Sequence, residues 1–274
     1  MSIDPSLREL PPRRMLTTMA SAVLRVILVL ALGLPGQAPV EVPAPAPPSL
    51  TVVIDPGHGG DDRGAVGPSG IEEKLVALSV AQRARALAGE RGVRVMLTRE
   101  DDRQVSLMQR AAFANGAGAA VFITLHANAG PSPVSAGAEV ASFAGGTAVP
   151  PPTAAEDRAL LVPLTGGGTR KIAAVPWEQA QTRHAEVAAA FAKRVGEHLQ
   201  RIGPLGPRAV YRAPLRPLTS VNMPAVLVDV GYVSNPEEEK LVAGEARQTA
   251  LAQALIEAML AFDPAPKPAP RAPR

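Results

Sequence analysis

Strand-like and helix-like segments alternate along the middle of this chain, and this alternation limits the folds that it can adopt. Short β-branched and apolar runs predict buried strands, and apolar residues three and four positions apart predict helices. The predicted strands are 51–55, 93–97, 121–125, 139–143 and 225–230, and the predicted helices are 75–87, 107–114, 184–202 and 246–260. Strands separated by helices indicate an α/β domain with a central mostly parallel or mixed sheet, flanked by helices on both faces.

The first residues have the pattern of an export signal. Arg13 and Arg14 precede the apolar run Val26–Leu34, which ends in the small-residue segment Pro35–Ala38. This pattern predicts that residues 1–38 are an export signal or a signal anchor, because the apolar run is shorter than the ~20 residues that span a membrane. We therefore expect an exported protein of the periplasm or cell envelope, with membrane contact or anchoring only through this segment.

Proline-rich segments bound the predicted domain on both sides. Residues 39–49 are a Pro/Ala linker, and residues 263–274 are a Pro-rich basic tail, so the folded domain is predicted at 50–262. Within it, residues 145–176 are rich in Gly, Pro and Thr without a clear period. We interpret them as a long loop or insertion.

Composition excludes several kinds of site. The chain of 274 residues has no cysteine, so disulfides, thiolate nucleophiles and Cys-ligated zinc are absent. It has 28 basic and 25 acidic residues, a net charge of +3, and only 3% aromatic residues. This balance does not suit a nucleic-acid-binding surface.

Two histidines follow predicted core strands. His58 lies in the glycine-rich turn Asp55–Gly60 after the first strand, and His126 follows the third. The turn has no lysine for a P-loop, and Asp62 stands where a dinucleotide-binding turn needs its third glycine. Because ligands bind at the carboxyl ends of strands in open α/β sheets, we expect the two imidazoles to converge there as zinc ligands.

Carboxylates complete the candidate site. A catalytic zinc takes three protein ligands, and the third is Glu73, at the start of the first helix, or its neighbour Glu72. Asp229 ends the last predicted strand, where it either takes a proton from zinc-bound water or binds the amides of the next turn. His184 and His198 share one predicted helix and are expected at the surface.

Seven ordered motifs carry a resemblance to a known family. They are Asp55–Gly60; Gly64-Ala65 with Gly70, Glu73-Lys74 and Leu78; Thr98-Arg99 with Asp102; Leu107 with Arg110 and Ala114-Asn115; Leu125–Asn128; Pro224–Leu227; and Gly231–Pro236. With these motifs the domain resembles the zinc-dependent N-acetylmuramoyl-L-alanine amidases, which include the bacterial cell-division amidases. The resemblance runs from Val52 to about Leu260.

The resemblance implies a function and a ligand set. His58, Glu73 and His126 would bind one zinc ion per chain, with Glu73 chosen over Glu72 because the family's ligand directly precedes the lysine. The implied reaction hydrolyses the amide between N-acetylmuramic acid and L-alanine in peptidoglycan, and a protein activator is a potential further partner.

One position departs from the family pattern. The family's catalytic glutamate is replaced by Asp229, whose side chain is shorter by one methylene, and Glu139 is the reserve candidate for that role. The alternative function is therefore a catalytically weak peptidoglycan-binding relative that keeps the zinc site. Where the division amidases carry a blocking helix, residues 145–176 show no helical period.

Overall fold

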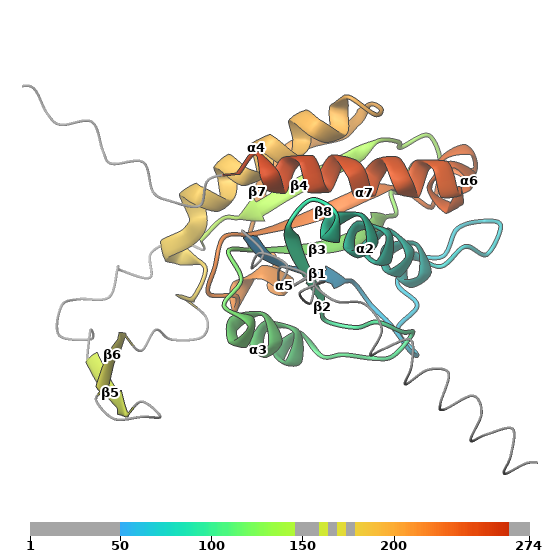
Figure 1. The fold of residues 1–274 in the computed structure, drawn as a ribbon. Coiled ribbons are helices and arrows are strands. Elements are labelled where there is room, and N and C mark those ends of the chain that lie inside the picture. Colours follow the sequence, from blue (N-terminus) through green and yellow to red (C-terminus); the bar gives the residue numbers. More distant parts are fainter. Residues whose placement is uncertain (1–49, 146–158, 164–168, 174–178, 263–274) are drawn as a thin grey trace, which may run out of the picture. The chain divides into compact units, whose positions relative to one another are not determined.

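The computed structural model describes residues 50–145, 159–163, 169–173 and 179–262 (Figure 1). The predicted export signal at 1–38, the linker at 39–49 and the tail at 263–274 lie outside these residues. Within the described part, no helix has both the length and the hydropathy that crossing a membrane requires.

The core of the domain is a six-stranded sheet in the order β2-β1-β3-β8-β4-β7. Four neighbouring strands are parallel; β4 runs antiparallel to β8, and β7 runs parallel to β4. The strands are β1 Leu50–Pro56, β2 Val93–Leu97, β3 Val121–Asn128, β4 Ala138–Phe143, β7 Leu205–Ala213 and β8 Ala225–Tyr232. The predicted mixed sheet is confirmed, and it places the carboxyl ends of β1, β3 and β8 along one edge.

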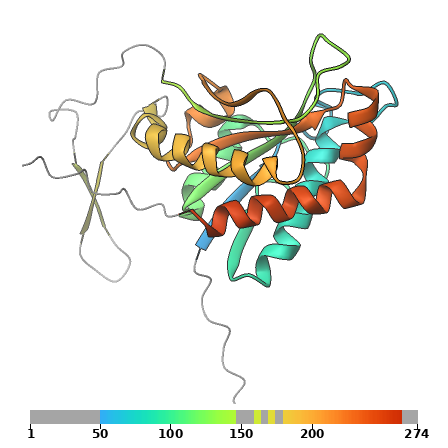
Figure 2. The same ribbon diagram turned by 90° about the horizontal axis from the view of Figure 1, so that it is seen from above.

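Helices cover both faces of this sheet (Figures 1 and 2). Helices α2 (Glu73–Gly89), α4 (Ala185–Gln200) and α7 (Glu245–Leu260) pack on one face; α3 (Leu107–Ala117) and the short α5 (Arg216–Thr219) pack on the other. The sheet has a hydrophobic core on each face, and alternate residues of β1 point into the two cores. Val52 and Ile54 lie in the core under α2, α4 and α7, and Val53 lies in the core under α3 and α5. This is the side-chain alternation of a strand buried on both faces.

Two helices begin at recognisable capping residues. The Ser106 hydroxyl accepts a hydrogen bond from the Gln109 backbone, and the Gln109 side chain accepts one from the Ser106 backbone, which makes a capping box at the start of α3. Asn235 caps α6 (Pro236–Ala243) by accepting from the amides of Glu237 and Glu238. These caps fix where the chain turns away from the sheet edge.

Several elements were not predicted from sequence. Strand β7 was missed because it contains a proline and lacks regular apolar alternation, and α6 was missed because it starts with a proline and three glutamates. Within 145–176, which the sequence predicts to be a long loop or insertion, β5 (Ala159–Pro163) and β6 (Thr169–Ala173) pair antiparallel. These two strands were not predicted, because they are short and stand among Gly, Pro and Thr residues.

One expectation about a single residue is also wrong. His198 is buried instead of lying at the surface, and its Nδ1 lies 3.3 Å from Glu257 Oε2. The buried face of α2 consists mainly of valine and alanine, and Leu75 near the start of this helix is 48% exposed. The helical period predicts α2 and α4 but does not say which neighbours cover each side chain.

Candidate active site

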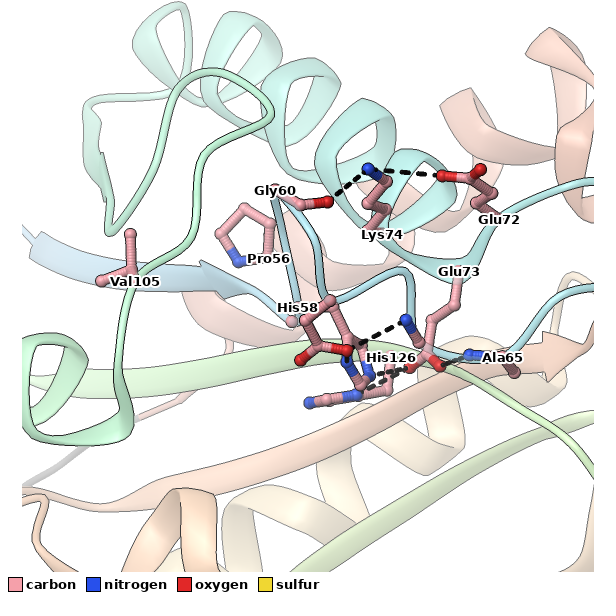
Figure 3. A network of polar contacts seen from close by, with 12 residues as sticks. Pro56, His58, Gly60, Ala65, Glu72, Glu73, Lys74, Val105 and His126 are labelled. Carbon is pink, nitrogen blue, oxygen red and sulfur yellow. Dashed lines mark hydrogen bonds and ion pairs between the residues drawn. The ribbon is translucent and has the colours of Figure 1, made fainter.

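The predicted ligands His58, Glu73 and His126 meet at the carboxyl edge of the sheet (Figure 3). Glu73 Oε1 lies 3.0 Å from His58 Nε2 and 2.7 Å from His126 Nδ1. The ligand-type atoms of all three residues lie within 4.8 Å of one another, the only grouping of this kind in the described part of the chain. Two imidazole nitrogens and a carboxylate oxygen therefore face a common point.

Two glycines allow the loops to close over this cluster. A Cβ at Gly57 would stand 2.4 Å from His126 Cε1, and a Cβ at Gly64 would stand 2.6 Å from Glu73 Oε2. Any larger residue would displace a member of the cluster. The glycines of the Asp55–Gly60 turn and of the Gly64-Ala65 motif are thus needed for close approach, not for binding a phosphate.

A buried arginine holds the turn that carries His58. His58 has a backbone φ of 58°, a left-handed conformation that non-glycine residues seldom adopt. Arg110 donates to the His58 carbonyl at 2.6 Å and to Asp55 Oδ1 at 2.6 Å. Asp55 is itself fixed by Thr124, whose hydroxyl donates to Oδ2 at 2.8 Å. The strained turn is therefore stabilised by a buried ion pair at the end of β1.

A second buried arginine and Lys74 complete the support. Arg99 is fully buried and donates to the carbonyls of Pro56 and Gly57. Lys74 donates to the Gly60 carbonyl and to Asp102 at 2.7 Å each. The sequence motifs contain Arg99, Arg110, Lys74 and Asp102, but the motifs alone do not show what these residues do. Charged residues in otherwise apolar motifs could have been noticed, because a buried charge needs a hydrogen-bonding or oppositely charged partner.

The structure also separates Glu73 from Glu72. Glu73 Oε2 accepts from the Ala65 amide at 2.8 Å, which orients the carboxylate toward the histidines. Glu72 Oε1 instead accepts a hydrogen bond from Arg63 Nε at 2.7 Å. Glu72 Oε2 lies 3.4 Å from Lys74 Nζ (Figure 3). Of the two candidates, Glu73 is the one in the cluster.

Asp62 orients His58 from the opposite side. Its Oδ1 lies 2.9 Å from His58 Nδ1 and accepts from the Gly64 amide at 3.1 Å. If His58 is neutral with its proton on Nδ1, the lone pair of Nε2 points toward Glu73 and His126. Sequence reasoning gave Asp62 no role, although a carboxylate behind a ligand histidine is common in metal sites.

Electrostatics keep this cluster charged. Burial alone would raise the pKa of Glu73, but hydrogen bonds from His126 and His58 hold that pKa far below its usual value. The hydrogen bond to Glu73 raises the pKa of His58, against the opposing effect of burial. A carboxylate that stays ionised is ready to bind a cation.

Asp229 lies beside the cluster on the neighbouring strand. It is opposite His126 in the β3–β8 pairing, so the two side chains leave the same face of the sheet. It is 7% exposed, and its side chain makes no hydrogen bond or ion pair with any residue that the structure describes. Burial raises the pKa of Asp229 to about 6. A carboxyl group with a pKa near neutrality can both take up and return a proton.

The reserve candidate Glu139 is next to Asp229 but is fully engaged. It is opposite Asp229 in the β4–β8 pairing and has no exposed surface. Its carboxylate accepts from Arg208 Nε at 2.7 Å and from the Tyr232 hydroxyl at 2.9 Å. Because these donors occupy its oxygens, Asp229 is the freer of the two carboxylates.

A cavity of about 310 Å³ adjoins the two histidines on the α3 and α5 side of the cluster. Besides His58 and His126, its walls include the hydrogen-bonding side chains of Gln104 and Ser106 and the apolar Leu107 and Pro217. The arrangement therefore offers three side chains of metal-ligand type, a neighbouring buried carboxyl group and space for a bound group.

Comparisons with known proteins point to one family. Residues 52–261 match the model of the N-acetylmuramoyl-L-alanine amidase family. The amidase AmiC of Neisseria meningitidis is 32% identical over 209 residues, which are 74% of this chain and 50% of that protein. The amidase AmiA of Escherichia coli is 30% identical over 217 residues, 77% of this chain and 75% of that protein.

A solved structure gives the same result for the fold. The amidase AmiC2 of Nostoc punctiforme superimposes with a TM-score of 0.59 at 29% identity, and the match covers 77% of this chain and 95% of that one. The match spans half the length of the Neisseria protein and three quarters of the Escherichia coli protein.

Proposed function

Because the chain belongs to the N-acetylmuramoyl-L-alanine amidase family, we propose that it hydrolyses the amide between N-acetylmuramic acid and L-alanine in peptidoglycan, and that the reaction depends on zinc. The observation that carries the proposal is the convergence of His58, Glu73 and His126 beside the buried, unpaired carboxyl group of Asp229.

The donor set fits zinc. Two imidazole nitrogens and one carboxylate oxygen match the three protein ligands of a catalytic zinc site, which leaves one position open. Zinc bound there would polarise the scissile carbonyl and acidify the attacking water. Asp62 would hold His58 in the tautomer that offers Nε2, and the Ala65 amide would hold the Glu73 carboxylate in place.

Asp229 is the proposed general base. Its carboxylate would take the proton of the attacking water and return it to the nitrogen of the leaving L-alanine. Its position opposite His126 and its lack of a competing hydrogen bond support this role. The shorter side chain, where the family has glutamate, is the one feature that favours the alternative of a weakly catalytic, peptidoglycan-binding relative.

Digestion of purified peptidoglycan distinguishes the active amidase from the weakly catalytic, peptidoglycan-binding relative. The protein is incubated with peptidoglycan and the products are analysed by mass spectrometry. The proposal requires free stem peptides that begin with L-alanine, formed by the untreated protein and not after removal of metal by a chelator. Sedimentation with peptidoglycan in the absence of such products would establish the alternative.

We also propose that the protein is exported and acts in the periplasm or cell envelope. The support is the signal-like sequence of residues 1–38 and the location of the proposed substrate. Cell fractionation tests it: recovery of the full-length chain in the cytosol, with its amino terminus intact, would overturn export. The need for a protein activator stays a prediction.

A further inference from the structure

Arg208, on the irregular edge strand β7, has a guanidinium group that is fixed on two sides. Its Nε and Nη2 lie 2.7 and 2.5 Å from Glu139 Oε2, and its Cζ lies 4.2 Å from the centre of the Tyr211 ring. The guanidinium also interacts with the Tyr232 side chain. The contacts with Glu139 use Nε and Nη2 and leave out Nη1, and the side chain is 50% exposed. A rigid guanidinium edge therefore faces solvent.

The backbone of β7 is distorted at this position. The β4–β7 pairing jumps from Ala138↔Leu205 to Val140↔Val210, so several residues of β7 lie opposite Glu139. Ala209 has a φ of 46°, a left-handed conformation that is unfavourable for alanine. The distortion turns both the Arg208 amide and its side chain toward Glu139. Bulges that redirect a side chain in this way are enriched beside active sites.

Arg208 lies on the far side of Asp229 from the α3–α5 cavity. Glu139 is the register partner of Asp229, and Arg208 binds Glu139 from the next strand. Neighbouring strands are about 4.8 Å apart, so β7 is two spacings from the strand that carries Asp229. The Arg208 side chain together with one peptide residue, about 3.8 Å between Cα atoms, can span that distance.

The charges around the cleft leave a role for this cation. The carboxylates Asp62, Glu73 and Asp229 lie at the site, whereas Arg99 and Arg110 are buried and donate to backbone carbonyls. A partly exposed guanidinium such as that of Arg208 can therefore receive a free carboxylate of the substrate, which these two buried arginines cannot. In N-acetylmuramic acid, the carboxyl group forms the scissile amide itself. Free carboxylates therefore occur on the peptide side of the bond.

We propose that Arg208 determines substrate specificity by binding, through Nη1, the free carboxylate on the second residue of the stem peptide. This inference rests on the amidase function proposed above, and it gives the orientation in which the substrate binds. The peptide extends over β4 and β7, and the sugar occupies the cavity beside α3 and α5. The Tyr211 ring and Glu139 hold the guanidinium in place, so that its free edge is presented to the ligand.

The test uses two synthetic muropeptides that differ only in a carboxylate or a carboxamide on the second peptide residue. The parent should cleave the carboxylate form with a kcat/KM at least about tenfold higher, as expected for loss of one charge-assisted hydrogen bond. In Arg208→Gln this ratio should fall to about one, mainly through a higher KM for the carboxylate form. Equal cleavage of both substrates by the parent would overturn the proposal.

Two further variants separate binding from folding. Arg208→Lys keeps a positive charge beside Glu139 and should retain part of the preference. Arg212→Gln is the matched control, because Arg212 lies on the same strand and pairs with the exposed Glu186 instead; its ratio should equal that of the parent. If Arg208→Gln slows both substrates equally, Arg208 serves only the fold. If the parent cleaves neither substrate, it is the amidase function that fails.

Discussion

At the scale of single residues, the geometry of the site depends on the candidate metal-binding residues and equally on the side chains that hydrogen-bond to them. His58 is held by Asp62 through Nδ1 and by Arg110 through its carbonyl, while its φ of 58° is unfavourable on its own. The three candidate ligands could be proposed from sequence because each follows a strand or begins a helix. Asp62 and Arg110 could not, because their roles follow from contacts that only the folded chain brings together.

Asp62→Asn should therefore weaken zinc binding without preventing folding. An asparagine places either an oxygen or an amide group against His58 Nδ1 and no longer fixes the ring by charge. The dissociation constant for zinc, measured by competition with a coloured chelator, should rise about tenfold or more. Asp61→Asn is the control, since Asp61 is exposed and its neighbour makes the contact. Equal zinc affinity in both variants would remove Asp62 from the site.

Asp229→Asn should keep zinc and lose activity. The amide has the shape of the carboxyl group but cannot accept the proton, so kcat should fall by about two to four orders of magnitude. Asp229→Glu tests the effect of a longer side chain that keeps the carboxylate. If the backbone has adapted to aspartate, the extra methylene should lower turnover. Zinc content and peptidoglycan digestion check both variants. Parent-like activity in Asp229→Asn would exclude Asp229 as the base, and Glu139 would be tested next.

At the scale of elements, helix α6 fixes the loop that leads into α2. Glu239 is buried, and its carboxylate accepts from the amides of Ser69 and Ile71 at 3.0 and 3.1 Å. This loop lies just before Glu73 in the chain. An element that sequence periodicity did not reveal therefore positions the start of the helix that supplies the predicted third ligand.

Glu239→Gln should destabilise the domain by about 1–3 kcal/mol. Glutamine has one neutral oxygen in place of the two carboxylate oxygens, so the buried amides of Ser69 and Ile71 lose a charged acceptor. Although burial opposes it, the backbone hydrogen bonds lower the pKa of Glu239. Its stabilising effect is thus present at neutral pH and lost as pH falls through the folded-state pKa, so parent and variant should converge in acid. Urea unfolding at pH 7 and below pH 4 measures this.

Glu237→Gln provides the comparison for that experiment. Glu237 is on the same helix, is exposed, and bonds only Lys240 with its side chain. Its stability should stay within about 0.5 kcal/mol of the parent at both pH values. A loss at Glu237 as large as that at Glu239 would mean that the effect comes from the helix charge and not from the loop contacts.

The elements differ in how well sequence predicts them, for physical reasons. Strands β1, β3 and β8 are buried on both faces, so their continuous apolar runs stand out in the sequence. Strand β7 is an edge strand with a distorted register, and its Arg208 contacts Glu139, which lies far away in the sequence. The cluster of His58, Glu73 and His126 could therefore be anticipated from the sequence, whereas the contacts of Arg208 could not.

At the scale of the whole molecule, the family and the fold are shown for residues 52–261. Within this part of the chain, the proposed ligands His58, Glu73 and His126 and the proposed base Asp229 lie at one edge of the sheet. The central claim is that the His58, Glu73 and His126 cluster binds the zinc that hydrolysis requires.

Titration of metal-free protein with zinc tests that claim most directly. Chelator-treated protein is mixed with increasing zinc, and release of peptides that begin with L-alanine is measured at each ratio. We predict that activity rises to a plateau at one zinc per chain for the parent and for Glu72→Ala, and that Glu73→Ala shows neither tight zinc binding nor activity. Full activity of the metal-free protein, or an active Glu73→Ala beside an inactive Glu72→Ala, would contradict the account.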